Sequence, residues 1–69
     1  MIRVLNIETS FGNAQIYNLF ADSKSEVTEP DSMHVEGLAD TSQLTQGCSV
    51  LTADGELAFL KSDKTWNWV

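Results

Sequence analysis

Apolar residues concentrate at the two ends of the chain, and a polar, acidic stretch separates them. This pattern divides one small domain, residues 1–69, into N-terminal strands or an arm over 1–21, an irregular acidic connection over 22–46 and a β-meander over 47–69. Residues 2–9 carry apolar side chains at both alternating sets of positions, which is typical of a strand covered on both faces or paired at an interface. Alternation places on one side Ile2, Val4 and Asn6, and on the other Arg3, Leu5 and Ile7.

Residues 10–13, Ser-Phe-Gly-Asn, predict a turn because glycine and asparagine adopt positive φ readily. The next segment, AQIYNLFA over residues 14–21, fits either a second strand that pairs with the first or two turns of helix. In a helix, Ile16, Tyr17 and Phe20 would share one face. The β-branched and aromatic content favours the strand, and we expect a strand with the helix as the alternative.

Two hairpin signals follow one another in the last third of the chain, GCSVLTADGELAFLKSDKTWNWV. The Asp-Gly pair at 54–55 lies between two apolar runs and favours a type I′ turn, which needs positive φ at both central residues. A two-residue loop then pairs Val50 with Phe59. A second, four-residue polar loop at 62–65 pairs Phe59 with Trp68. The sequence therefore predicts a three-stranded antiparallel meander.

Because side chains alternate along a strand, this register sorts the meander into two faces. The first face carries Val50, Thr52, Leu57, Phe59, Lys61, Trp66 and Trp68. The second carries Leu51, Ala53, Glu56, Ala58, Leu60, Asn67 and Val69. The first face is a core face. The second is too apolar to face water, so we expect the N-terminal part of this chain and another chain to cover it together, with cover by the N-terminal strand alone as the alternative.

The acidic connection is long for a loop, and loops beyond about 12–15 residues are usually functional or mobile. Its few apolar residues are Met33, Val35, Leu38 and Leu44. We expect this segment to lie across the sheet with those four side chains as anchors. The alternative is one helical turn over residues 38–44, capped by Asp40 or Thr41. The predicted fold is therefore mainly β, a small antiparallel meander of about four to five strands with little helix.

Composition excludes several classes of partner. With ten acidic and four basic residues, the net charge is −6 and the pI is near 4.3. Nucleic acid is excluded as a partner because phosphate binding needs clustered Lys and Arg, and anionic membranes are disfavoured for the same reason. No apolar run approaches the ~20 residues that span a bilayer. The first ten residues lack the apolar core of a signal peptide, which predicts folding in a cytoplasm.

Candidate chemistry is sparse. One cysteine excludes an internal disulfide, and one histidine with one cysteine cannot build a four-ligand zinc site. Cys48 and His34 are the one possible nucleophile and base, but nothing in the sequence brings them together or lowers the thiol pKa. The carboxylates of residues 22–31 do not match a calcium-loop spacing. We therefore expect no enzyme activity, no cofactor and no metal.

The C-terminal third carries one resemblance. Gly-Cys-Ser, a short strand, an Asp-Gly turn, Glu-Leu-Ala-Phe-Leu, a polar turn and a final Thr-Trp-x-Trp together resemble small tailed-bacteriophage virion proteins of the head-fibre or capsid-decoration type. The resemblance covers residues 47–69. It implies a non-enzymatic structural component of a bacteriophage particle, made in the host cytoplasm and located in the virion. The implied partners are the major capsid protein, further copies of the chain, or both.

We expect such a protein to act through its apolar sheet faces and through strand pairing, as an oligomer or part of a larger assembly. The expected interface residues are Leu51, Ala58, Leu60, Trp66, Trp68, Val69, Ile2 and Val4. An alternative is a small binding module that recognises a carbohydrate or a host protein through its aromatic face. A third hypothesis, an acidic inhibitor of a basic host protein, rests on the charge.

Overall fold

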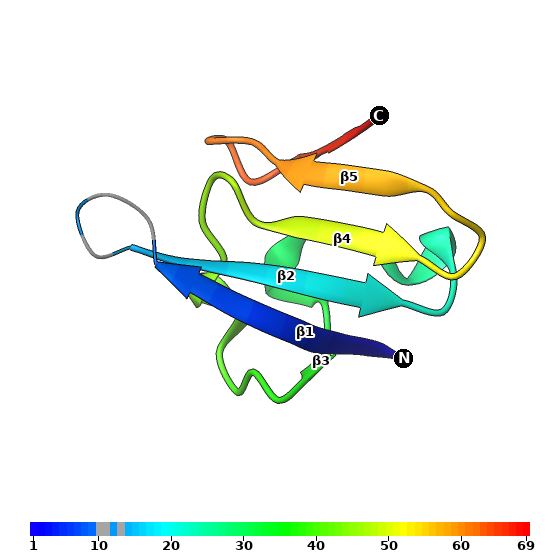
Figure 1. Cartoon of the computed structure of the whole chain (residues 1–69), viewed down its shortest axis with the longest axis horizontal. Coiled ribbons are helices and arrows are strands. Elements are labelled where there is room, and N and C mark those ends of the chain that lie inside the picture. The colour runs from blue at the N-terminus through cyan, green and yellow to red at the C-terminus, as the bar shows by residue number, and fades with distance from the viewer. Residues whose placement is uncertain (10–11, 13) are drawn as a thin grey trace.

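The computed structural model describes residues 1–9, 12 and 14–69. Its strands form one six-stranded sheet in the order β3-β1-β2-β4-β5-β6 (Figure 1). The strands are β1 (Ile2–Thr9), β2 (Gln15–Ala21), β3 (Val35–Glu36), β4 (Ser49–Thr52), β5 (Leu57–Leu60) and β6 (Trp66–Trp68). The helical segments of the described part are three short 3-10 turns, η2 (Lys24–Glu26), η3 (Pro30–Ser32) and η4 (Thr41–Gln43). The predicted mainly β fold with little helix is confirmed.

The sheet mixes antiparallel and parallel neighbours. β1 and β2 form an antiparallel hairpin, and β4, β5 and β6 form the predicted antiparallel meander. Two parallel pairs, β1 with β3 and β2 with β4, join these units into one sheet, which the sequence pattern did not indicate. The segment 14–21 contains the strand β2 (Gln15–Ala21) rather than a helix, with the side chains of Tyr17, Leu19 and Ala21 buried. The turn predicted at 10–13 lies largely outside the described residues.

One face of the sheet, here called the inner face, is covered by the connection between β2 and β4, which runs behind the sheet in Figure 1. All four predicted anchors of this connection are buried in the core: Met33, Val35, Leu38 and Leu44. They pack with the inward side chains of the strands, among them Ile2, Leu19, Val50 and Leu60. The connection also contains the 3-10 turn η4, where Asp40 Oδ1 accepts a hydrogen bond from the Ser42 amide at 3.0 Å. The cover of the sheet is thus the acidic middle of the chain.

The first loop of the meander corrects the predicted register. The Thr52 amide donates to the Glu56 carbonyl at 2.8 Å and the Gly55 amide to the Thr52 carbonyl at 3.0 Å, so the loop holds three residues rather than two. Gly55 has φ +88°, the left-handed conformation that ends a three-residue hairpin loop. Val50 therefore pairs with Ala58 and not with Phe59.

The second loop repeats this geometry. The Lys61 amide donates to the Thr65 carbonyl at 2.9 Å, the Lys64 amide donates to the Lys61 carbonyl at 3.0 Å, and Lys64 has φ +68°. Trp66 consequently pairs with Leu60 instead of Lys61. Each hairpin therefore pairs one residue away from the predicted register, and a shift of one residue moves every side chain of a strand to the opposite face. The first shift exchanges the faces of β5 relative to β4, and the second shift returns β6 to its predicted face. Only β5 is inverted.

The inversion of β5 changes which residues meet water. Ala58 and Leu60 lie on the buried inner face, whereas Leu57 and Phe59, predicted as core, lie on the outer face. The predicted grouping of Leu51 with Ala58 and Leu60 is therefore wrong.

A β-bulge also shifts the register within β1. Val4 pairs with Leu19, but Asn6 pairs with Asn18, so Leu5 is the extra residue. Beyond the bulge, Asn6 shares the outer face with Asn18, while Ile7 pairs with the inward-facing Tyr17. The predicted sides of Asn6 and Ile7 are thus exchanged.

Candidate binding surface on the outer face of the sheet

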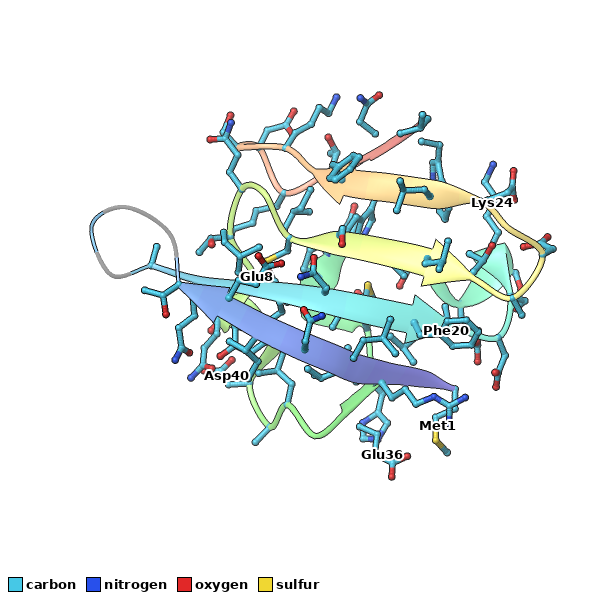
Figure 2. The ribbon with its side chains drawn as sticks, in the orientation of Figure 1. Met1, Glu8, Phe20, Lys24, Glu36 and Asp40 are labelled. Atoms are coloured by element: carbon cyan, nitrogen blue, oxygen red, sulfur yellow. The ribbon has the colours of Figure 1, made fainter. Side chains whose placement is uncertain are left out.

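The outer face of the sheet is crossed by two rows of side chains that follow the strand pairing. The first row runs through Glu36, Arg3, Phe20, Leu51 and Leu57. Val69 ends this row, because its amide donates to the Leu57 carbonyl at 2.9 Å. The second row runs through Asn6, Asn18, Ser49, Phe59 and Asn67. Figure 2 looks onto this face, with Glu8 toward the β1–β2 hairpin end and Phe20 toward the other end.

The apolar side chains of these rows form a patch over β2, β4, β5 and the end of the chain. We define the open-face patch as Phe20, Leu51, Leu57, Phe59 and Val69. Leu51 is 40% exposed, Phe59 43% and Val69 85%, and no described segment covers them. Such a group on one flat face is typical of a surface that binds another protein.

Polar side chains next to the patch satisfy one another. The Asn18 amide nitrogen donates to Asn6 Oδ1 and to Glu8 Oε1, both at 2.6 Å. Asn18 Oδ1 accepts from Ser49 Oγ at 2.6 Å. Both hydrogens of the Asn18 amide are therefore used, and its orientation is fixed. A partner that covers this row does not have to supply hydrogen bonds to Asn18.

Charge is distributed unevenly around the sheet. Six of the ten acidic residues lie in the connection that covers the inner face: Asp22, Glu26, Glu29, Asp31, Glu36 and Asp40. Three more lie at the two loops of the meander: Asp54, Glu56 and Asp63. In the outer-face rows, charged residues occur on β1 and β3, and the Arg3 guanidinium lies 5.4 Å from the centre of the Phe20 ring. The side chains of the patch are uncharged, as those at the centre of a protein interface usually are.

The eight predicted interface residues fall into three groups. Leu51 and Val69 are exposed in the open-face patch. Ile2, Ala58 and Leu60 are buried in the core of the chain itself.

The remaining three, Val4, Trp66 and Trp68, are partly buried against that core. The sequence analysis missed Phe20, Leu57 and Phe59 as surface residues. The Asp-Gly pair at 54–55 also fits a three-residue loop, and that choice of loop would have placed Leu57 and Phe59 on the outer face.

The two tryptophans hold the covering connection against the sheet. Trp66 Nε1 donates to the Thr28 carbonyl oxygen at 2.8 Å. The Lys24 ammonium lies 4.7 Å from the centre of the Trp68 ring, within cation–π range. Both indoles thus contact the middle of the chain, and they do not form a flat exposed platform.

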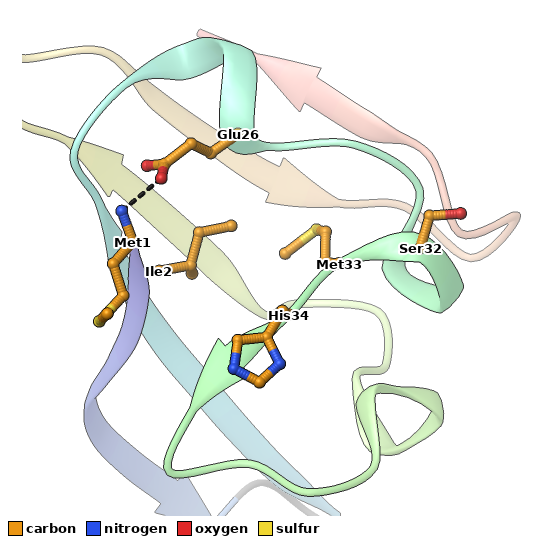
Figure 3. A pocket seen from close by; sticks show the side chains of 6 residues that line it. All are labelled: Met1, Ile2, Glu26, Ser32, Met33 and His34. Atoms are coloured by element: carbon orange, nitrogen blue, oxygen red, sulfur yellow. Dashed lines mark hydrogen bonds and ion pairs between the residues drawn. The ribbon is translucent and has the colours of Figure 1, made fainter.

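Cys48 and His34 are far apart in the order of the sheet. Cys48 precedes β4, is fully buried, and its Sγ accepts a hydrogen bond from the Tyr17 amide at 3.3 Å. His34 precedes β3 at the other side of β1 and β2, where it lines a hollow of about 320 Å³ (Figure 3). Beside it, the Met1 amine pairs with the Glu26 carboxylate. The two groups therefore belong to separate places in the fold.

Within the described residues, no group of three or more His, Cys, Asp or Glu side chains is arranged to hold a metal ion. None of the described helical segments is long and apolar enough to cross a membrane. Comparisons with protein-family models, with curated proteins and with solved structures found no match to this chain.

Proposed function

We propose that this protein is a non-enzymatic structural component of a bacteriophage particle, an accessory protein that binds the capsid through its open-face patch. One observation carries the proposal: the large apolar side chains of the patch share one sheet face that no described segment covers. The resemblance of residues 47–69 to small tailed-phage virion proteins supports a phage particle as the assembly that the protein joins. We therefore propose the virion as the location of the protein.

The distribution of charge supports a protein partner. Eight of the ten acidic residues lie in the covering connection outside β3 or at the loops of the meander, and the other two, Glu8 and Glu36, are outside the open-face patch, so a partner meets a centre of uncharged side chains. Full burial of a Leu, Val or Phe side chain contributes about 1.5–3 kcal/mol. Because Leu51 and Phe59 are already partly buried, a partner gains a fraction of that from each, about 1 kcal/mol.

The test combines particle composition with binding. Mass spectrometry of purified particles is expected to find the chain, and recombinant protein is expected to bind particles that lack it. Leu51→Glu and Phe59→Glu place a charge in the patch and are expected to abolish binding. Ser32→Glu, an equally charged change at an exposed position in η3, serves as the matched control. A chain that is absent from particles and does not bind them contradicts the proposal.

A second candidate is a module that recognises a carbohydrate or a host protein through aromatic side chains. The observation in its favour is the exposed ring of Phe59, which pairs across the strands with two polar residues, Ser49 and Asn67. Titration calorimetry with sugars or host proteins distinguishes the two. Saturable binding that Phe59→Ala removes would favour this second function, and absence of binding would favour the first.

A further inference from the structure

The outer edge of β1 is unpaired along most of its length. β3 pairs with β1 at Ile2 and Arg3 alone, so in the described part of the chain no strand lies beside residues 5–9 on that side (Figure 1). Leu5 and Ile7 on this stretch are 54% and 52% exposed. Of the devices that protect a free edge, residues 5–9 carry the bulge at Leu5 and one charge at Glu8, but neither Lys nor Pro. The backbone of this stretch has no described partner on that side and is available for pairing.

We propose that this edge pairs antiparallel with the same edge of a second copy, with a two-fold axis at Ile7. The proposal does not depend on the proposed function, because residues 5–9 are not part of the open-face patch. An axis at Ile7, the centre of the free stretch, sets Ile7 against its own counterpart, Leu5 against Thr9 and Asn6 against Glu8. The two half-exposed isoleucines cover one another, and each carboxylate meets an amide.

Neighbouring registers are less favourable. An axis at Glu8 sets two carboxylates directly opposite one another, which is destabilising. An axis at Asn6 sets Glu8 of one copy against Val4 of the other. Val4 lies beside the connection that follows β3, since a Cβ placed on Gly37 would be 3.9 Å from Val4 Cγ2. A partner strand in that register would collide with this connection.

We infer a second copy as the partner because residues 5–9 are complementary to the same residues of another copy that runs antiparallel to them. Each copy carries net charge −6, but residues 5–9 contribute a single charge, Glu8. Repulsion between the copies is therefore long-range and screened by salt, with a Debye length of about 10 Å at 0.1 M. We expect association to strengthen as ionic strength rises. A contact made by residues 5–9 of each copy is small, and small interfaces are usually weak.

The test uses the full chain and opposite charges at one position. Sedimentation velocity over micromolar to millimolar concentrations is expected to show a monomer–dimer equilibrium for the wild type. Ile7→Lys and Ile7→Glu are each expected to be monomeric, because like charges meet on the axis. An equimolar mixture of the two variants is expected to recover the dimer, which also shows that both variants are folded. Ser32→Lys, at an exposed position in η3 outside this edge and outside the open-face patch, is expected to dimerise like the wild type.

Three results would overturn the proposal. One is a wild type that stays monomeric at the highest concentration. Another is a mixture of the Ile7 variants that remains monomeric although circular dichroism shows each to be folded. The third is a dimer that Leu51→Lys dissociates and the Ile7 variants do not, which would place the contact on the open-face patch. Particle binding by the Leu51 and Phe59 variants is a separate measurement, so failure of one proposal is distinguishable from failure of the other.

Discussion

Leu44 tests whether the acidic connection stabilises the sheet. Its side chain is fully buried between the connection and the inner face, and the Lys64 ammonium donates a hydrogen bond to its carbonyl oxygen. The Leu44 amide donates a hydrogen bond to the Thr41 carbonyl at 3.1 Å, which holds the backbone in place. Because the backbone cannot move inward to fill the space, Leu44→Ala leaves a cavity. Buried leucine-to-alanine changes cost about 2–5 kcal/mol, and we expect about 3 kcal/mol here.

This loss is large for so short a chain. Domains are stable by roughly 0.05–0.15 kcal/mol per residue, which gives about 3–10 kcal/mol for this one. At about 4–8 °C per kcal/mol for a domain of this size, Leu44→Ala lowers the melting temperature by about 12–24 °C. Leu51→Ala removes the same atoms from a side chain that is 40% exposed, and is expected to cost about 1 kcal/mol or less.

The assay is urea unfolding followed by tryptophan fluorescence and by far-ultraviolet circular dichroism. Trp66 contacts Thr28, so its emission reports the docking of the connection, while dichroism reports the strands. The two signals are expected to change together, with a lower midpoint for Leu44→Ala and an unchanged slope. If Leu44→Ala and Leu51→Ala lower the midpoint equally, the connection is not the cover of the sheet.

Three further predictions concern the meander. Leu60→Ala is expected to lower the free energy of unfolding in urea by about 2–5 kcal/mol, and Phe59→Ala is expected to lower it clearly less. The reverse order would support the two-residue loop predicted from the sequence. Gly55→Ala is expected to cost about 1–2 kcal/mol, because its φ of +88° penalises a Cβ and no atom within 4 Å compensates; unchanged stability would argue against the three-residue loop. Hydrogen bonds from the Thr65 hydroxyl and amide lower the pKa of Asp63 below its usual 3.8, so this contribution to stability is present above that pH and is lost as the pH falls through the lowered value. Asp63→Asn is therefore expected to unfold more easily than wild type at neutral pH, with the difference shrinking as the pH falls below 3.8; a difference that does not change with pH would contradict this.

Local signals predicted the strands well. Alternation and β-branched content placed β1 over its observed bounds, and the anchors Met33 and Leu44 were evident because apolar residues are rare in the connection. The loop lengths were not predicted, since an Asp-Gly pair is compatible with both two- and three-residue hairpins. That single ambiguity moved Leu57 and Phe59, two of the five residues of the open-face patch, between core and surface.

The pairings between distant strands had no sequence signal. β2 and β4 pair in parallel through Leu19 and Val50, two ordinary buried residues that would suit an antiparallel neighbour equally well. The bulge at Leu5 likewise has no glycine or proline beside it that would mark it in the sequence. The open-face patch depends on the parallel pairing, which places Phe20 beside Leu51, so it required the three-dimensional arrangement.

The parallel pairing of β2 with β4 joins segments that are distant in the sequence, so we expect it to form after the local hairpins. The β1–β2 hairpin and the β4–β5–β6 meander each depend on nearby residues, and hairpins of this kind form in about 1–10 μs. Joining them requires residues 22–48 to close as one long loop, a step that is slow because its entropy is lost before the contacts form. Until that step, both half-sheets expose their inner faces, and the same step that completes the sheet brings its own cover into place.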